Sequence, residues 1–324
     1  MTRRRKIVLF LTAVAAALAL DWTFFGTLPP GPAHSRAKPD LSALPAFDVC
    51  WAEFGSDKGP GFFLSTGWST TVAAQITVSS LVVRHPRGIL MIDSGDSSKL
   101  AEEIAELPGA FDRLYMRLLP GGIKLFATAP QALKRLGIEP ASLAGIVLTH
   151  AHVDHVGGVV DLPGVPVVLS PAEMDFVTSS STRSNFHIFP AHARALAGRM
   201  KPIEWKNIPY EVFDQSADLF GDGSVVAVPL SGHTPGSIGV FVNISEDLRI
   251  LHIGDTAMVK ESYERPAGKG LVVSLLDLDR QATNRQLQLL KQLHQQVPKL
   301  IILPAHDRAV WREIFADAPC RGAH

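Results

Sequence analysis

Short hydrophobic runs recur along the chain, each bounded by glycine, proline or polar residues. Short runs rich in valine, isoleucine and leucine predict β-strands whose side chains are largely buried. The sequence HPRG at positions 85–88 has proline and glycine where a tight turn between the first two strands needs them. We expect strands over residues 74–83, 88–93, 145–149, 167–169, 225–230, 237–243, 248–253 and 299–303.

Helices are indicated by capping residues and by apolar spacing. Thr128 and Gln131 have the capping-box spacing at the start of one helix. Ser170 and Glu173 have the same spacing at the start of another, with a proline at its first helical position. Leucines within residues 281–296 recur on one helical face. Strands and helices therefore alternate, which predicts a layered α/β domain.

A histidine or an aspartate stands at or shortly after the end of four predicted strands, at Asp93, His150, Asp255 and His306. His233 lies in a further connection, the Gly- and Pro-rich segment SGHTPGS between two strands. Strand ends that meet at one edge of a sheet are where binding and catalytic sites are assembled. We therefore expect a site at that edge.

The densest group of such residues is HAHVDH at positions 150–155. No serine or cysteine is paired with a base as in a nucleophilic triad, and the pattern of a phosphate-binding loop is missing. Closely spaced imidazoles with a carboxylate instead suit a divalent metal. Asp154 and His155 are adjacent and are expected to point apart, which favours two metals over one. The alternative is a polar loop with histidines by chance, which gives no reason for their position directly after a buried strand.

The N-terminus differs in character from the rest of the chain. A basic head at residues 2–6 precedes an apolar run at residues 7–20, which is short for a spanning helix of about 20 residues. Residues 1–27 are therefore interpreted as a signal peptide or an N-terminal membrane anchor. Both interpretations predict export, with a periplasmic or secreted protein, or one anchored to the inner membrane through this segment if it is uncleaved. Residues 28–46 are predicted as a linker and residues 47–324 as the folded domain.

Net charge bears on which partners the chain can bind, and the two cysteines bear on whether it carries a disulfide. Residues 1–37 hold five of the 31 basic and one of the 31 acidic side chains, which leaves 26 basic, 30 acidic and a formal charge of −4. A mildly acidic body argues against nucleic acid as a partner. Cys50 and Cys320 could pair in an oxidising compartment and join the two ends of the mature chain; the alternative is two unrelated thiols. The sequence does not predict an oligomeric state.

HAHVDH matches the HxHxDH signature of the metallo-β-lactamase superfamily, which the chain resembles over roughly residues 70–310. The other family positions follow in order: Asp93 in IDSGD, His233 in SGHTPGS, Asp255 in HIGDT and His306 in LPAHD. The resemblance implies an α/β fold, an αββα sandwich of two mixed β-sheets flanked by helices. It also implies that the site lies at one edge of the sandwich.

The resemblance implies two metal sites. The first metal would be held by His150, His152 and His233. The second would be held by Asp154, His155 and His306, and Asp255 would bridge both. Two Zn²⁺ ions are expected, and iron, manganese or cobalt also accept such mixed nitrogen and oxygen ligands. Asp93 would orient a ligand histidine, or would serve only as a turn former at the strand end.

The expected mechanism follows from the metals. Two neighbouring cations can share a water molecule and lower its pKa to about 7. The resulting metal-bridging hydroxide would attack an electrophilic carbonyl or phosphorus atom, while the metals polarise the substrate oxygen and stabilise the leaving group. Asp154 is the expected catalytic residue, because it can orient the hydroxide or pass a proton to the leaving group.

The substrate is expected to be a small molecule, and the chain looks most similar to the acyl-homoserine lactonase-like members of the family. Asp255 and His306 together resemble the dinuclear lactonases, glyoxalase II enzymes and phosphodiesterases, whereas true metallo-β-lactamases generally lack the bridging aspartate. A lactone or similar carboxylic ester is therefore expected. The alternatives are a thioester, a β-lactam or a phosphodiester, or a mononuclear iron oxygenase on the same fold. The apolar segment GPGFFLSTGW at 59–68 could wall a hydrophobic pocket or pack in the core.

One position departs from the lactonases that the chain resembles. Many of them have a tyrosine three residues after the bridging aspartate, where this chain has Met258. Tyr263 is either a substitute for that tyrosine or an ordinary packed side chain. His187 and His192 lie in an insertion that could cover a pocket. They are given no role as metal ligands, and a role in substrate binding is the less favoured alternative.

Overall fold

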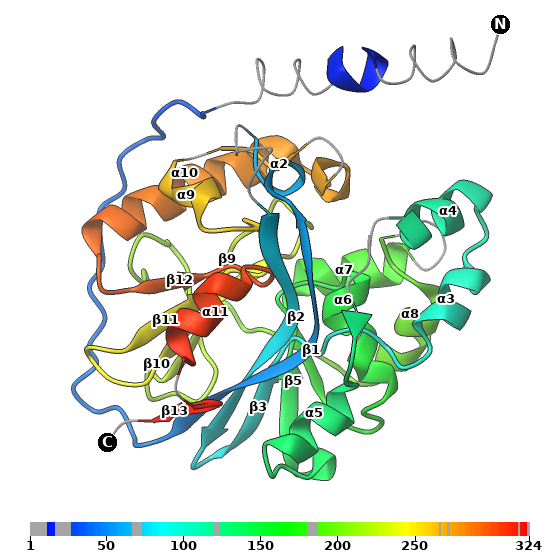
Figure 1. Ribbon diagram of the computed structural model, residues 1–324. Helices are drawn as coiled ribbons and strands as arrows, with labels where there is room; N and C mark the ends of the chain where they lie inside the picture. The colour runs from blue at the N-terminus through cyan, green and yellow to red at the C-terminus, as the bar shows by residue number, and fades with distance from the viewer. Residues whose placement is uncertain are drawn as a thin grey trace, which may run out of the picture.

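Two β-sheets lie against each other, with helices on their outer sides (Figure 1). The computed structural model describes residues 12–16, 27–66, 73–118, 124–180, 187–265, 267–270, 273–316 and 318–322. This layered arrangement confirms the αββα sandwich expected from the sequence.

The larger sheet has the strand order β13-β1-β2-β3-β5-β6-β7, with β4 paired to β1. Strands β1, β2 and β3 pair antiparallel, whereas β3, β5, β6 and β7 pair parallel, so the sheet is mixed. His85 pairs with Gly88 across the β2–β3 connection, which confirms the predicted tight turn. The strands are β1 Asp48–Pro60, β2 Ala73–His85, β3 Gly88–Ile92, β4 Lys124–Leu125, β5 Leu143–Val147, β6 Val167–Leu169, β7 Met200–Pro202 and β13 Cys320–Gly322.

The smaller sheet has the order β12-β11-β10-β9-β8. Strands β11 and β12 pair parallel and the others antiparallel, so this sheet is mixed as well. Its strands are β8 Ala217–Asp218, β9 Val225–Pro229, β10 Ile238–Asn243, β11 Arg249–His252 and β12 Ile301–Leu303.

Helices α3 to α8 gather beside the larger sheet, and α9 and α10 lie by the smaller one (Figure 1). The helices are α2 Gly61–Leu64, α3 Leu100–Glu106, α4 Ala110–Leu118, α5 Ala129–Arg135, α6 Val153–Val156, α7 Pro171–Ser180, α8 Pro190–Leu196, α9 Glu261–Glu264, α10 Arg280–Gln296 and α11 Arg308–Ile314. Short 3₁₀ turns cover Pro140–Ser142 (η1), Gly157–Val160 (η2) and Val273–Leu276 (η3).

The layers are joined by apolar clusters. Leu133 of α5 packs with the inner strands of the larger sheet in one cluster. Val83 of β2 and Val240 of β10 belong to a second cluster, which lies between the two sheets. Leu290 of α10 packs with Leu251 of β11 in a third. Burial of these apolar surfaces stabilises the sandwich and fixes where its strands end.

The helix signals in the sequence are confirmed. Thr128 and Gln131 form the predicted capping box at the start of α5, where the Thr128 N–H donates to Gln131 Oε1 at 3.0 Å. Ser170 Oγ accepts the Glu173 N–H at the start of α7. The strand β5 begins two residues earlier than predicted. The long strand β1 was not predicted, because its sequence mixes charged residues and glycines with the apolar ones.

The segment interpreted as a signal peptide or an anchor lies mostly outside the described residues, which include only 12–16 of the first 26. In the described part of the chain, no helix has the length and apolarity needed to cross a membrane. The segment 28–46, predicted as a linker, runs along the body. Its Ala37 forms a β-bridge with Glu211, and Arg36 forms an ion pair with the same glutamate. His34 N donates to Gln292 of α10.

The two cysteines form a disulfide. Cys50 of β1 and Cys320 of β13 are directly paired across neighbouring strands and are bonded to each other. The bond therefore joins the C-terminal strand to the start of the folded domain. Of the two predictions from the sequence, pairing of the cysteines is confirmed.

Candidate metal centre

The candidate ligands come from loops that follow strands at one edge of the sandwich. His150 and His152 follow β5, and His152 is the N-cap of the short helix α6. His233 lies between β9 and β10, Asp255 follows β11, and His306 follows β12. The structure therefore brings together residues that are up to 156 positions apart in the chain, as the strand-end pattern predicted.

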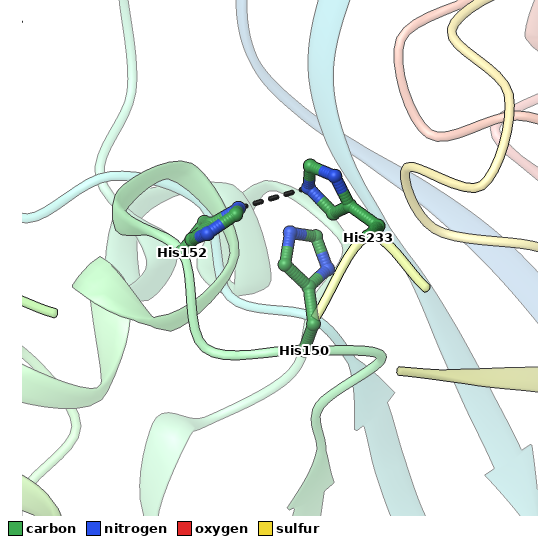
Figure 2. A group of neighbouring side chains, drawn as sticks. All are labelled: His150, His152 and His233. Atoms are coloured by element: carbon green, nitrogen blue, oxygen red, sulfur yellow. Dashed lines mark hydrogen bonds between the residues drawn. The ribbon is translucent and has the colours of Figure 1, made fainter. Parts of the chain in front are cut away.

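Three histidines converge in a first group (Figure 2). The side chains of His150, His152 and His233 each offer a nitrogen, and these nitrogens lie within 4.8 Å of one another. His152 Nδ1 is 2.8 Å from His233 Nε2. His150 Nε2 is buried and has no hydrogen-bond partner among the described residues. Three imidazoles converging in this way fit a tetrahedral metal with one open position.

A second group lies beside the first and consists of Asp154, His155 and His306. His306 Nε2 is 3.3 Å from Asp154 Oδ2, and His155 Nε2 is 3.9 Å from Asp154 Oδ1. His155 Nε2 is buried without a hydrogen-bond partner in the described part of the chain. This orphaned nitrogen is where a cation would restore a favourable contact.

Asp255 lies between the two groups. Its Oδ1 is 3.2 Å from His155 Nε2 and 3.1 Å from His306 Nε2, and its Oδ2 is 3.5 Å from His233 Nε2. Oδ1 is itself buried and accepts no hydrogen bond from a described residue. One oxygen thus faces each group, which is the placement that a bridging carboxylate needs. The seven side chains fit two divalent metals.

The electrostatics differ between the two groups. Burial, together with the neighbouring histidines, lowers the pKa of His150 and of His152 well below the usual value, which favours neutral imidazoles. Burial also acts to lower the pKa of His306, but the carboxylates of Asp255 and Asp154 outweigh it and raise that pKa to about 9. The second group therefore attracts positive charge, whether from protons or from a metal.

Asp93 orients His155, as one of the two sequence interpretations held. Asp93 Oδ2 accepts a hydrogen bond from His155 Nδ1 at 2.8 Å, which leaves His155 Nε2 facing Asp255. The Thr149 N–H donates to Asp93 Oδ1 at 2.7 Å. Asp93 has a φ of 61°, an unusual conformation for a residue other than glycine, and these hydrogen bonds hold it there.

The comparisons with known proteins agree with this geometry. The sequence profile described as the metallo-beta-lactamase superfamily matches residues 74–306. The chain belongs to the metallo-β-lactamase superfamily. With a histidine-rich site of this kind at the edge of the fold, it is a metal-dependent hydrolase.

Named relatives of this superfamily cover most of the chain. The N-acyl homoserine lactonase AttM of Azorhizobium caulinodans is 24% identical over 246 residues, which are 76% of this chain and 87% of that protein. The probable metallo-hydrolase Rv2300c of Mycobacterium tuberculosis is 25% identical over 254 residues, which are 75% of this chain and 79% of that protein.

Solved structures of the superfamily show the same fold. An N-acyl homoserine lactone hydrolase with N-hexanoyl-L-homoserine at its catalytic metal center aligns with a TM-score of 0.62 at 17% identity, covering 83% of this chain and 97% of that one. AidC, a dizinc quorum-quenching lactonase, aligns with a TM-score of 0.56 at 15% identity, covering 84% of this chain and 90% of that one.

Several residues that support this superfamily site were not found from the sequence. Asp277 Oδ1 accepts a hydrogen bond from His233 Nδ1 at 2.7 Å, so that His233 Nε2 faces the first group. The buried Lys269 forms an ion pair with Asp277 and lies 2.9 Å from His233 Nδ1. No motif marks Lys269 or Asp277, which reach the site only through the folding of distant loops.

Glu173 ties two of the ligand loops together. Its buried carboxylate accepts hydrogen bonds from the Ala151 N–H at 2.8 Å, the Thr234 hydroxyl at 2.7 Å and the Gly236 N–H at 3.0 Å. Ala151 lies between His150 and His152 in the chain, and Thr234 follows His233. Burial raises the pKa of Glu173 to about 7 against the opposing effect of these hydrogen bonds. The sequence marked Glu173 only as part of a helix cap.

His187 and His192 lie in different surroundings. His187 Nδ1 is 3.2 Å from His152 Nε2, and the two rings are stacked with centroids 5.3 Å apart. Burial lowers the pKa of His187 to about 4. His192 Nε2 instead lies 3.0 Å from Glu103. His187 therefore contacts a candidate ligand, which the sequence did not predict, whereas His192 does not.

A cavity of about 160 Å³ opens onto the candidate ligands. Its walls include His152, Asp154, Asp255 and His306. Apart from Asp96, the other lining residues in the described part of the chain are apolar: Leu64, Ile76, Leu100, Met116, Leu125, Val153, Met258, Val273 and Leu276. Of the segment 59–68, Leu64 reaches this wall, while the side chains at 62–63 and residues 67–68 lie outside the description.

Met258 lines this cavity at the position where many lactonases have tyrosine, and Tyr263 does not replace it. The Tyr263 side chain is buried among the residues that pack against the smaller sheet. Its hydroxyl donates to the Ile302 carbonyl oxygen at 3.1 Å. Of the two sequence interpretations, the packed side chain is correct.

Proposed function

We propose that this metal-dependent hydrolase opens lactones, with an N-acyl homoserine lactone or a similar carboxylic ester as substrate. The observation that carries the proposal is the apolar cavity that ends on Asp154, Asp255 and His306. Such a cavity suits a neutral ring with an apolar tail and presents the ring to the candidate metal ligands. The names of the AttM relatives support the same substrate class.

The cavity wall argues against a phosphodiester substrate. Among the described lining residues there is no lysine or arginine, the side chains that usually bind a phosphate. His306 completes the second group of ligands, and Asp255 lies between the two groups. A complete second group argues against a mononuclear oxygenase, because such an enzyme uses mainly the first group. Thioester and β-lactam hydrolysis stay as alternatives that a substrate panel separates.

Two metals, zinc in this proposal, would be held by the seven candidate ligands and would supply an activated water and an electrophile for the substrate carbonyl. Asp154 is the proton carrier in this scheme. Its side chain is 25% exposed, whereas His306 and Asp255 are each 4% exposed, so Asp154 reaches the cavity most readily. The activated water would add to the carbonyl carbon while Asp154 takes up the proton that the water loses. Collapse of the tetrahedral adduct would break the ring C–O bond, and Asp154 would pass that proton to the departing alkoxide. The product is a hydroxy acid.

Export is part of the proposal. The disulfide between Cys50 and Cys320 supports an oxidising compartment, in line with a signal peptide or an anchor at residues 1–27. Cell fractionation with an antibody to the folded domain, combined with mass analysis of the mature N-terminus, distinguishes a cleaved from an anchored protein. A cytoplasmic protein that retains residues 1–27 would overturn this part.

The substrate proposal is tested on protein from residue 28 onward, which keeps the 28–46 segment packed on the body. Zinc-loaded protein is supplied with an N-acyl homoserine lactone, a thioester, a β-lactam and a phosphodiester, and acid release is followed in weak buffer. We expect the lactone to be hydrolysed with the highest kcat/KM. Higher kcat/KM on another member of the panel would replace the lactone with that class.

A further inference from the structure

Asp96 is held beside the candidate metal ligands by close backbone packing. It follows β3 in the segment IDSGD and lines the cavity together with Asp154 and His306. The Gly158 N–H donates to the Gly95 carbonyl oxygen at 2.9 Å. A Cβ atom at Gly157 would lie 2.8 Å from the Asp96 carbonyl carbon, closer than real Cβ atoms approach. The two segments therefore touch only because Gly157 lacks a side chain, and this contact fixes Asp96 next to the ligand loop.

The Asp96 carboxylate has no hydrogen-bond partner among the described residues, although it is attracted electrostatically by His155 and His306. It makes no hydrogen bond and no ion pair with any described residue, whereas Asp93, in the same segment, is fully engaged. Apart from the candidate ligands, every other described residue that lines the cavity is apolar. An unpaired carboxylate in such a wall is unfavourable for folding, so its presence points to a role in binding.

The chemistry of the substrate limits what Asp96 can bind. A lactone ring has hydrogen-bond acceptors, its carbonyl and ring oxygens, but no donor. Burial and the charge of Asp154 raise the pKa of Asp96 to about 8 in the absence of metals. Two divalent metals held beside it would favour the ionised form, which only accepts hydrogen bonds, so its partner has to be a donor on a substituent of the ring. A substituent with a positive charge would be repelled by the two divalent metals that the neighbouring ligands would hold. A neutral amide N–H has no such conflict.

We propose that Asp96 recognises the N–H of an acylamino substituent on the lactone ring and thereby selects N-acylated amino lactones over lactones without that donor. This inference rests on the proposed lactonase function and makes it more specific. Asp96 is then a specificity-determining residue: it orients the ring carbonyl toward the candidate ligands, while the acyl tail extends along Leu100 and Met116.

The test uses two substrates that differ in one group. One is an N-acyl homoserine lactone, and the other is its analogue in which CH₂ replaces the N–H. Homoserine lactone with its free ammonium group is the third arm and tests a cationic donor. The proteins are zinc-loaded wild type, Asp96→Leu, which removes the acceptor at similar size, and Asp96→Asn, which keeps one acceptor oxygen. Both kcat/KM for ring opening and the Kd of the ring-opened products are measured.

For wild type, we expect kcat/KM to be at least about tenfold higher for the N–H substrate than for the CH₂ analogue, the size expected for a hydrogen bond to a charged group. Asp96→Leu should reduce this preference to less than about threefold by losing activity on the N–H substrate alone, and product binding should weaken in parallel. Asp96→Asn should retain most of the preference. The free amine should be a poor substrate for all three proteins.

Three results would overturn the inference. Equal losses on both acyl substrates in Asp96→Leu would mean that Asp96 acts on the ring or on the metals. Equal kcat/KM for the N–H and CH₂ compounds in wild type would mean that no donor is recognised. A preference for the free amine would replace the amide N–H with a cationic donor. Wild type with two metals that opens none of the rings would instead refute the lactonase function itself.

Discussion

The ring of His187 is stacked on that of His152, with His187 Nδ1 3.2 Å from His152 Nε2. On its other side, His152 Nδ1 lies 2.8 Å from His233 Nε2. A metal held between those two nitrogens needs a lone pair on each, so the His152 proton has to be on Nε2. His187 Nδ1 is the acceptor for that proton. His187 is therefore expected to fix the tautomer of His152.

His187→Phe keeps an aromatic ring for stacking and removes the acceptor. We expect it to weaken the binding of one zinc ion by about 10- to 100-fold, because groups that orient metal ligands have effects of this size. Competition with a chromophoric chelator measures the two affinities. His187→Asn, which keeps an acceptor, should recover part of the loss. His192→Phe is the matched control, because His192 is buried in the same region but bonds to Glu103; an equal loss in this control would contradict the role of His187.

Glu173→Gln tests the link between the two ligand loops. The amide would keep one acceptor oxygen and would place its N–H₂ group against a hydrogen-bond donor. We expect the free energy of unfolding of chelator-treated protein to fall by about 1–3 kcal/mol, the usual effect of leaving buried polar groups unpaired. Urea denaturation measures it. Glu313→Gln, at a side chain that is 64% exposed, should change stability by less than about 0.5 kcal/mol. Similar effects of the two substitutions would refute the link.

Cys320→Ser removes the bond between β13 and β1. We expect the free energy of unfolding to fall by about 2–5 kcal/mol, because the unfolded chain loses the constraint that closes a very long loop. Reductant should destabilise the wild type to a similar extent and should leave the variant unchanged. If reductant present throughout the unfolding experiment left the free energy of unfolding of the wild type unchanged, the two cysteines would not be joined in solution.

The stability of chelator-treated protein should depend on pH through His306. Burial opposes its protonation, but Asp255 and Asp154 raise its pKa from 6.5 to about 9. A histidine with a raised pKa stabilises the fold while it is protonated, so this contribution is complete below pH 6.5 and is lost as the pH rises through about 9. We expect the melting temperature to fall over that range, and His306→Gln to have a flatter profile. An identical slope in the variant would contradict this assignment.

The strand-end pattern in the sequence indicated where some of the candidate ligands lie, and the resemblance to the superfamily supplied the full set of seven. His150, Asp255 and His306 each follow a short apolar strand, and strands of that kind end at a common edge once the sheets form. Thr128 and Ser170 correctly predicted where two helices begin, because a capping residue bonds to backbone groups only a few positions away in the sequence. Sequence periodicity failed for β1, whose charged and glycine residues pair along β2 and acquire their conformation from that partner strand.

The residues that hydrogen-bond to the candidate ligand histidines could not be predicted from the sequence. Asp277 lies 44 residues from His233, and His187 lies 35 residues from His152, with no fixed spacing that links either pair. The role of Asp96 could not be predicted from the sequence either, because an aspartate after Gly95 looks like an ordinary turn residue. Its significance depends on the apolar wall around it, which is assembled from segments far apart in the chain.

Measuring zinc content and ring opening on the same protein samples shows whether a two-metal centre opens the lactone ring. The samples are wild type, Asp255→Asn and His306→Ala, each loaded with zinc and desalted. We predict two zinc ions per wild-type chain with release of acid from an N-acyl homoserine lactone, and loss of zinc together with a loss of kcat/KM of about 100-fold or more in both variants. Wild type that holds two zinc ions without opening the ring would refute the lactonase activity. His306→Ala that keeps full activity with one zinc ion would refute the need for a second metal.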